Sequence, residues 1–374
     1  NMINKERLMN NFLDLVKIPS PSLMEREIAD NLKLQLTSLG LEVFEDEAHK
    51  NTGSNSGNII GILRGSNNIS KKKILFSSHM DTVLPCEKIT PIIDGDIIKT
   101  DGTSVLGSDD KSGIAAIIEM LTVIKEKDLE HPEIIVIFSI SEEIGLKGAK
   151  EINDEIIKNV DFGFIIDSGE KPGTVINKAP YSAKGKIEII GKSSHAGEPE
   201  KGINALFVAS HAISKLPIGK VDTETTCNIG TISGGTAVNI VMEKVEMAFE
   251  ARSQSLPKLE ELLEKTNKIF EDTCTSFGAK LINEVKKGTP GYNISLDSEV
   301  LKIFENACKN INLEFKVISS QGGSDANIYN SKNIPTLNLA IGMSEIHTTN
   351  EFININDIAD CTKLLLELVK ITIN

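Results

Sequence analysis

The sequence predicts an α/β protein: a mostly parallel mixed sheet with helices on both faces, plus an inserted, smaller α+β domain. Three observations lead to this fold class. Early in the chain, continuous apolar runs alternate with helical segments, which is typical of parallel strands covered on both faces. From about Tyr181 the strands alternate apolar and polar residues, which indicates one solvated face. After about residue 292 the first pattern returns.

The elements of the larger domain follow in chain order. A helix is predicted over residues 22–40, because apolar residues recur at helical spacing, Ser22 and Glu25 have the spacing of a capping box, and Gly40 is a stop signal. Strands and helices then alternate: we expect strands at 59–63, 73–78, 133–141 and 162–167, and helices at 112–127 and 146–154.

The inserted domain is predicted to contain one four-stranded antiparallel sheet with two helices on one side. Its clearest strands are 182–192, 227–235 and 245–253, and its helices are 205–216 and 258–274. A Gly/Pro break, "KKGTPGY", follows, and the larger domain resumes with a helix at 298–312, strands at 315–319 and 336–342, and a long C-terminal helix. The predicted division is 1–181 and 289–374 for the larger domain and 182–288 for the inserted one.

Composition limits the possible partners. The 40 Lys and Arg residues against 53 Asp and Glu give a net charge of −13, which argues against nucleic acid and anionic membranes as partners. No apolar run reaches the roughly 18 residues of a membrane span. The five cysteines are scattered and form no C-x-x-C pair, so we expect a reducing, cytoplasmic compartment.

Polar residues accumulate at the predicted strand ends, where ligands bind in open α/β sheets. Each has an ordinary structural alternative: Asp109 as an N-cap, Asp110 as a first-turn carboxylate, Glu142 and Glu143 as a solvated turn. Together, however, carboxylates at one sheet edge would repel one another without a cation. Histidines and carboxylates suit a borderline metal, and two ions about 3.5–4 Å apart would share a bridging carboxylate. The residues concerned are His79, Asp81, Asp109, Asp110, Glu142, Glu143, Asp167 and His347.

Seven segments in order resemble one known family over nearly the whole chain: "SSHMDTV", "GSDDKSGIAAI", "SISEEIGLKGAK", "IIDSG", "SSHAG", "GGSDAN" and "EIHTTNE". They resemble the co-catalytic zinc exopeptidases, which include peptidase T (tripeptide aminopeptidase), carboxypeptidase G, and the succinyl-diaminopimelate and acetylornithine deacylases. The resemblance is closest to peptidase T-like members, and it implies the zinc exopeptidase fold for the larger domain.

The resemblance implies two Zn²⁺ ions per subunit, with Co²⁺ or Mn²⁺ as alternative metals. It implies that one ion is held by His79, Asp109 and Asp167, and the other by Asp109, Glu143 and His347. Asp81 matches the carboxylate that hydrogen-bonds the second nitrogen of the ligand histidine. Glu142 matches the general base that takes a proton from the attacking water and passes it to the leaving amine.

In the inserted domain, His195 matches a histidine that donates to the substrate's developing oxyanion, in its own chain or in a neighbour's. Asn239 and Arg252 match residues that bind substrate carbonyl or carboxylate groups, and Arg252 has a structural ion pair as its alternative role. Glycines 322 and 323 match a loop whose N–H groups approach the substrate, or else form a simple turn. Family members with this insertion pair through it, so a homodimer is expected.

The expected reaction is removal of the N-terminal residue from short peptides. Glu143 stands within a Glu-Glu pair, and Asp167 is the residue type that in this family accompanies di- and tripeptidases. The runner-up is a dizinc carboxypeptidase or N-acyl amino acid deacylase in which Arg252 grips a carboxylate. A remote third hypothesis is an inactive binding or assembly protein on the same fold. A small peptide is thus the expected substrate.

Overall fold

The computed structural model describes residues 2–66 and 72–373. It divides the chain into two compact units. The larger unit runs up to Lys178 and resumes at Ile294, and the smaller unit comprises Ala179–Asn293. The sequence placed these divisions after residues 181 and 288. Within the described residues, no helix has the length and apolar composition required to cross a membrane.

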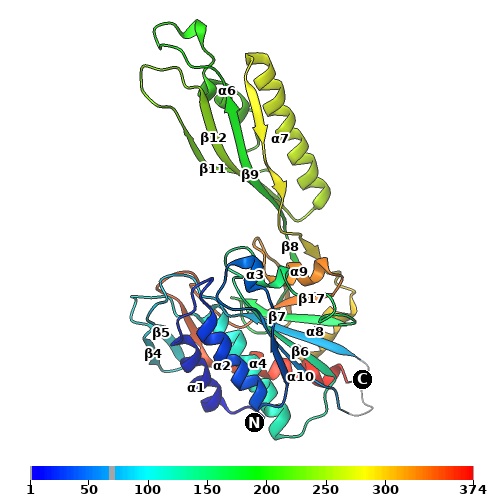
Figure 1. The fold of residues 1–374 in the computed structure, drawn as a ribbon. Helices are drawn as coiled ribbons and strands as arrows, with labels where there is room; N and C mark the ends of the chain where they lie inside the picture. Colours follow the sequence, from blue (N-terminus) through cyan, green and yellow to red (C-terminus); the bar gives the residue numbers. More distant parts are fainter. Residues whose placement is uncertain (1, 67–71, 374) are drawn as a thin grey trace. The chain divides into compact units, whose positions relative to one another are not determined.

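A mixed sheet forms the core of the larger unit (Figure 1). Its strand order is β1–β2–β6–β3–β7–β17–β8, with β16 beside β8. The central strands β6, β3, β7 and β17 are mutually parallel. Strands β1 and β2 pair antiparallel with their neighbours, and β8 pairs antiparallel with β17 but parallel with β16. The bounds are β1 Glu42–Glu45, β2 Ile59–Leu63, β3 Lys73–His79, β6 Glu133–Ser139, β7 Phe162–Ser168, β8 Thr174–Ala179, β16 Lys316–Ser319 and β17 Thr336–Ala340.

Helices cover both faces of this sheet, as predicted. A Cβ added to Gly113 in helix α4 would lie 2.3 Å from the Ser78 hydroxyl of β3, whereas Ser139 of β6, level with His79, donates to Asp325 of helix α9. Because successive strand residues point to opposite faces, α4 and α9 cover opposite faces. The helices of the larger unit are α1 Lys5–Val16, α2 Arg26–Ser38, α3 His49–Thr52, α4 Ser108–Glu126, α5 Lys147–Lys150, α8 Glu299–Asn310, α9 Asp325–Ser331 and α10 Ile355–Ile371.

The central strands are apolar because helices cover both of their faces. Strands β3 and β6 are buried at every position after their first residue. The helix predicted at 146–154 is only the single turn of α5. A separate three-stranded sheet, which the sequence did not predict, has the order β18–β5–β4, with bounds Phe352–Asn354, Ile97–Thr100 and Pro91–Asp94.

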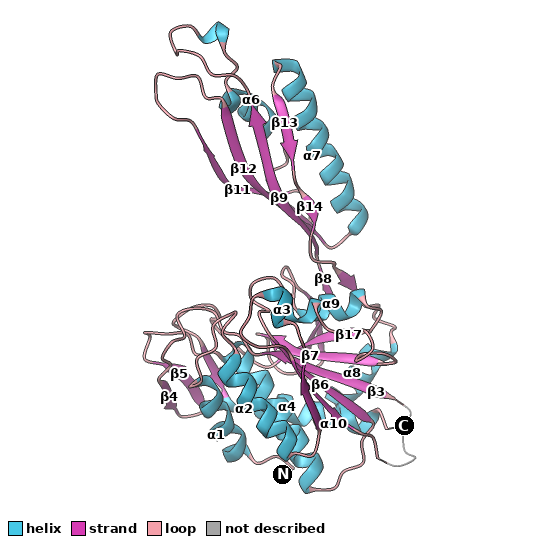
Figure 2. Cartoon of the chain, in the orientation of Figure 1, coloured by secondary structure: helices cyan, strands magenta, loops and turns pink. Residues whose placement is uncertain are grey.

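The smaller unit is an antiparallel sheet with the order β10–β11–β12–β9–β13, and β14 also pairs with β9 (Figure 2). It therefore has six strands rather than the predicted four, but β10 and β14 have only two residues each. Helices α6 and α7 share one hydrophobic core with alternate residues of β9 and β12. The bounds are β9 Tyr181–Ile190, α6 Ala205–Ile213, β10 Gly219–Lys220, β11 Thr225–Gly234, β12 Lys244–Ser253, α7 Leu256–Phe277, β13 Lys280–Asn283 and β14 Lys286–Lys287, with the short strand β15 (Tyr292–Asn293) in the return connection.

The predicted capping box at the start of α2 is wrong. The helix begins at Arg26, and its N-cap Glu25 makes no side-chain cap hydrogen bond. The Ser22 hydroxyl instead donates to the Asp81 carboxylate at 2.6 Å, and Glu25 accepts from the Ser141 backbone N–H at 2.8 Å. Both side chains therefore form hydrogen bonds with loops of the candidate site rather than with the start of α2.

Candidate metal centre

The larger unit brings together the polar residues at its strand ends. His79 is the last residue of β3, Asp167 is next to last in β7, and Asp109 lies in the first turn of α4. Glu143 follows β6, and His347 follows β17. Three overlapping groups of side chains are candidate ligand sets, and within each group the ligand atoms lie within 4.8 Å of one another. The groups are His79, Asp109 and Asp167; His79, Glu142 and Glu143; and Asp109, Glu143 and His347.

Asp109 is the residue that joins the two histidines. Its Oδ1 lies 3.0 Å from His79 Nε2, and its Oδ2 lies 3.0 Å from His347 Nε2. The same His347 nitrogen is 3.0 Å from Glu143 Oε1, and His79 Nε2 is 3.8 Å from Asp167 Oδ1. One carboxylate therefore presents an oxygen to each of two groups of candidate ligands, which is the arrangement of a bridging ligand.

Asp81 contacts the other side of the His79 ring. The ring Nδ1 lies 2.8 Å from the Asp81 backbone oxygen and 3.2 Å from its Oδ1. An acceptor at Nδ1 requires a proton there, which leaves Nε2 with its lone pair facing Asp109 and Asp167. This is the tautomer that a metal ligand needs.

The Asp81 carboxylate also holds the turn that carries Glu142 and Glu143. It accepts the backbone N–H of Glu142 at 2.9 Å and that of Glu143 at 3.2 Å, in addition to the Ser22 hydroxyl. Buried Glu25 supports the preceding residue, since it accepts both the N–H and the hydroxyl of Ser141. Asp81 thus orients His79 and the Glu142–Glu143 turn together.

Neighbouring strands fix Asp167. Asn338 of β17 donates through its amide nitrogen to the Asp167 backbone oxygen at 3.1 Å and accepts the Asp167 N–H at 3.0 Å. This pair of hydrogen bonds extends the parallel β7–β17 ladder, which shifts register near its end. The sequence analysis did not identify Asn338, whose signal is an amide within an otherwise apolar strand.

The titration of these groups reflects a crowded anionic site. Burial raises the pKa of Glu142 and of Asp167 well above their ordinary values, and neighbouring carboxylates raise both further. Although burial opposes its ionisation, hydrogen bonds from His347 and His79 hold the pKa of Asp109 below its usual range. Hydrogen bonds to Asp109 and Glu143 raise the pKa of His347 to about 10. Such a site attracts positive charge.

The donor set fits divalent zinc-like ions. Each of the two groups that share Asp109 offers one imidazole nitrogen and two carboxylates, the ligand types that zinc accepts. The hydrogen bonds to Asp81 and Asn338 supply the outer support that such ligands require. The structure therefore contains candidate metal-ligand groups at the sheet edge predicted from the sequence.

Three of the predicted site residues lie in the smaller unit. His195 and Ile240 form an isolated antiparallel bridge, and the Ala196 N–H donates to the Asn239 backbone oxygen at 2.9 Å, so His195 and Asn239 lie on adjacent segments. Arg252, near the end of β12, forms an ion pair with Glu250 two residues earlier on the same strand. A structural ion pair of this kind is the alternative to substrate binding that the sequence analysis left open for Arg252.

The two glycines lie in the loop between β16 and α9. The Gly322 N–H donates to the Ser320 hydroxyl at 3.0 Å, so this amide is used within the turn. Gly323 immediately precedes Ser324, which begins α9 with a capping box.

The sequence analysis missed two buried carboxylates near the candidate metal centre, although both stand in segments that carried the resemblance. They are Asp325, which accepts from Ser139, and Glu351, which accepts from the loop that leads into Asp109.

The fold and the site together define the class: an α/β protein whose sheet edge carries a candidate metal centre of two histidines and shared carboxylates. Residues 75–371 match the model of Peptidase family M20/M25/M40. The chain belongs to this family. The prediction of an enzyme, a metal-dependent peptidase, is thereby confirmed.

Similar proteins agree with this assignment. The crystal structure of aminopeptidase PepT from Bacillus cereus ATCC 10987 is 40% identical and superposes with a TM-score of 0.96, covering 100% of both chains. That of a tripeptidase from Staphylococcus aureus subsp. aureus mu50 is 39% identical with a TM-score of 0.95, also over 100% of both. Peptidase T of Clostridium perfringens (strain 13 / Type A) is 27% identical over 98% of this chain and 99% of its own. The predicted peptidase T-like relationship and fold class are confirmed.

Proposed function

We propose that this peptidase removes the N-terminal residue from tripeptides and similarly short peptides, with two zinc ions bound per subunit. The observation that carries the proposal is the placement of Asp109, whose two carboxylate oxygens each lie 3.0 Å from a different histidine. The substrate class is supported by the similarity over the full chain to an aminopeptidase and a tripeptidase.

The two groups that share Asp109 would hold the metals. His79, Asp109 and Asp167 would bind one ion, and Asp109, Glu143 and His347 the other. When bound, the ions would polarise the scissile carbonyl and acidify the attacking water. Glu142 is left as a carboxylate outside both groups, and its pKa, raised by burial, favours exchange of a proton. It would take the proton from the water and deliver it to the leaving amine.

His195 would donate a hydrogen bond to the oxygen of the tetrahedral intermediate. The Gly197 backbone N–H donates to His195 Nδ1 at 3.0 Å, so Nδ1 is the acceptor and Nε2 carries the ring proton of the neutral imidazole. The exposed ring therefore offers its Nε2–H as a donor. Asn239, on the adjacent segment, and Arg252 would bind carbonyl or carboxylate groups of the peptide, and glycines 322 and 323 would border it.

The replacement His195→Ala is expected to lower kcat roughly a hundredfold, with a small change in KM, because a donor to the oxyanion acts mainly in the transition state. Steady-state kinetics on a tripeptide measures both constants. His211→Ala, which removes the half-buried histidine of α6 that packs on Phe207, is the control and should retain full activity. An effect of His195→Ala confined to KM would assign this residue to ground-state binding instead.

The reaction class is tested with one tripeptide in three forms: free at both ends, N-acetylated and C-amidated, each with and without a chelator. Cleavage of the free and amidated forms but not the acetylated form, abolished by the chelator and restored by Zn²⁺, is expected. Cleavage that tolerates the acetyl group but needs the free carboxylate would indicate a carboxypeptidase or deacylase. We do not favour that alternative, nor an inactive binding protein, because the two similar solved structures are those of an aminopeptidase and a tripeptidase.

We also propose a homodimer formed through the smaller unit. Among the described residues, β11 pairs with β10 only at Thr226 and Cys227, so its stretch 228–234 has a strand partner on the β12 side alone. Exposed apolar side chains of the same unit include Ile232 on β11 itself, together with Leu206, Phe207 and Ile240. An open strand edge with apolar neighbours favours pairing with a second copy. Sedimentation equilibrium that gives the monomer mass at micromolar concentration would contradict this proposal.

The proposed compartment is the cytoplasm. All five cysteines are free and buried, as expected for thiols kept reduced. Detection of the protein in cell fractions outside the cytoplasm would contradict this assignment.

A further inference from the structure

The side chain of Glu351 binds the loop that leads into Asp109. Its Oε1 accepts the backbone N–H groups of Leu106 at 2.8 Å and Gly107 at 2.9 Å. Its Oε2 accepts the Ser108 hydroxyl at 2.5 Å and the Asp109 N–H at 3.1 Å. The side chain is buried, with 2% of its surface exposed, so these four donors replace water around the carboxylate.

All four partners of Glu351 are donors, so the site requires an acceptor-only group. An ionised carboxylate supplies one. A glutamine of the same shape would place its NH₂ group against the N–H groups of Leu106 and Gly107 in one orientation. In the other orientation the NH₂ group would meet the Asp109 N–H and the Ser108 hydroxyl, of which only the hydroxyl can turn to accept. The requirement is therefore specific to a carboxylate and is not met by filling the same volume.

Glu351 also connects two segments that carry candidate ligands. It stands four residues after His347 in the sequence. The last of its four consecutive partners is Asp109, and the Asp109 carboxylate contacts His347 directly. A weaker contact lies nearby: the Thr100 hydroxyl at the end of β5, which donates to the Ser104 backbone oxygen at 3.0 Å, is 3.4 Å from the Thr349 backbone oxygen. Glu143, the third member of that ligand group, is held separately by the Asp81 carboxylate.

We propose that Glu351 is a positioning residue that holds Asp109 and His347 at the spacing needed for metal binding. This inference rests on the two-metal site of the proposed function. Both Asp109 and His347 belong to the group completed by Glu143, whereas the group of His79 and Asp167 shares only Asp109 with it. Loss of the Glu351 carboxylate therefore weakens the Glu143 group more than the other.

The test is a titration of the metal-free protein with Co²⁺, followed by calorimetry and by the visible absorption of the bound cobalt. The wild-type protein is expected to bind two equivalents. In Glu351→Gln one equivalent is expected to bind about 10–100-fold more weakly, the range found when outer support of a metal ligand is removed. The other equivalent keeps an affinity closer to that of the wild type.

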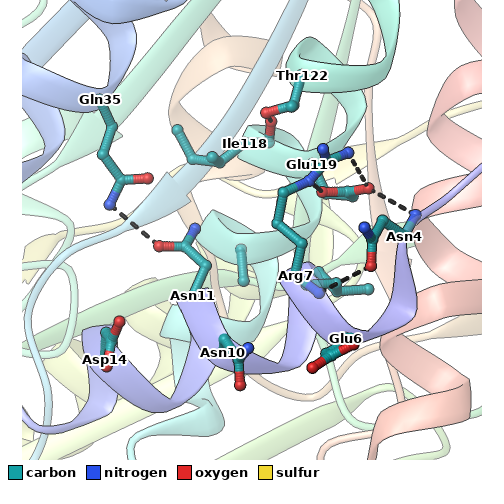
Figure 3. A pocket seen from close by; sticks show the side chains of 12 residues that line it. Asn4, Glu6, Arg7, Asn10, Asn11, Asp14, Gln35, Ile118, Glu119 and Thr122 are labelled. Atoms are coloured by element: carbon teal, nitrogen blue, oxygen red, sulfur yellow. Dashed lines mark hydrogen bonds and ion pairs between the residues drawn. The ribbon is translucent and has the colours of Figure 1, made fainter. Parts of the chain in front are cut away.

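Glu119→Gln is the matched control. Glu119 lies on helix α4, whose first turn carries Asp109, and is also 2% exposed. It accepts hydrogen bonds from Arg7 and from the Asn4 backbone N–H beside a surface pocket lined by α1, α2 and α4 (Figure 3). This variant loses a buried carboxylate of similar structural value but is expected to bind both cobalt equivalents as the wild type does. Equal losses in the two variants would overturn the inference, because they would indicate a general loss of stability.

Unchanged affinity for both equivalents in Glu351→Gln would also overturn the inference, as would a wild-type protein that binds no cobalt. If Glu351→Gln does not fold, Ser108→Ala replaces it. That variant removes only one of the four donors, and a smaller loss at the same equivalent is expected; wild-type affinity would again refute the inference. Failure of the proposed function is distinct: it appears as absent tripeptide cleavage by a wild-type protein that binds two equivalents normally.

Discussion

The variant Glu142→Gln is expected to retain both metals and to lose about 10²–10⁴-fold in kcat, the contribution typical of a general acid–base group. Glutamine has the shape of glutamate but cannot accept a proton from water or pass one to the leaving amine. Glu142 is buried beside the ligand groups, and its backbone N–H is held by Asp81, so the replacement leaves the turn in place. Single-turnover kinetics on a tripeptide measures the effect.

The metal content of the same preparation decides how a loss of activity is interpreted. Glu142 also forms a third candidate ligand group with His79 and Glu143, whose ligand atoms lie within 4.8 Å of one another, so its role as base must be separated from a role as ligand. Metal analysis by mass spectrometry should show two ions in Glu142→Gln and fewer than two in Glu143→Gln. Near-normal turnover with both metals bound would remove Glu142 from the role of base, and loss of a metal would make it a ligand.

The second large effect is expected from Asp109→Asn, which should lose metal and activity together. Asp109 is the only residue shared by the two proposed metal-ligand groups, and each of its oxygens faces a different histidine. An asparagine offers one oxygen and an NH₂ group that cannot act as a ligand. The bridge is therefore broken on one side, whichever way the amide points.

Metal content after dialysis and tripeptide hydrolysis in added Zn²⁺ are the two measurements for Asp109→Asn. Asp357→Asn is a suitable control, because Asp357 is also a buried carboxylate of the larger unit. Its partner is Lys171, and it belongs to none of the three candidate ligand groups found among the described residues. The control should keep two ions and full activity. Two tightly bound ions in Asp109→Asn would contradict the bridging role.

Much of the fold was predictable from the sequence because it depends on local patterns. The apolar runs that became β3, β6 and β7 are buried at nearly every position, and the alternating residues of β9 and β12 divide between a core and a solvated face. The candidate ligands were found because histidines and carboxylates at the ends of apolar strands are unusual. Their order along the chain then matched a known family.

The partners of individual polar side chains were not predictable in the same way. Ser22 and Glu25 have the spacing of a capping box, but their partners Asp81 and Ser141 are 59 and 116 residues away. For Arg252 the sequence left two roles open, substrate binding and a structural ion pair, and its ion pair with Glu250 became visible only in the structure. Local spacing shows which contacts a polar group can make, whereas its actual partner depends on which donors and acceptors the folded chain brings near.

The sequence was therefore sufficient for the central strands of both sheets, for most of the longer helices and for the types of residue at the sheet edge, but not for the small β18–β5–β4 sheet. Tertiary structure decided that Asp109 lies between the two histidines, that Asp81 orients both His79 and the Glu142 turn, and that Glu351 accepts four donors from a loop 242 or more residues away. The physical reason is that burial removes water, so each buried carboxylate must find its donors within the protein, and the nearest donors are set by packing rather than by sequence distance.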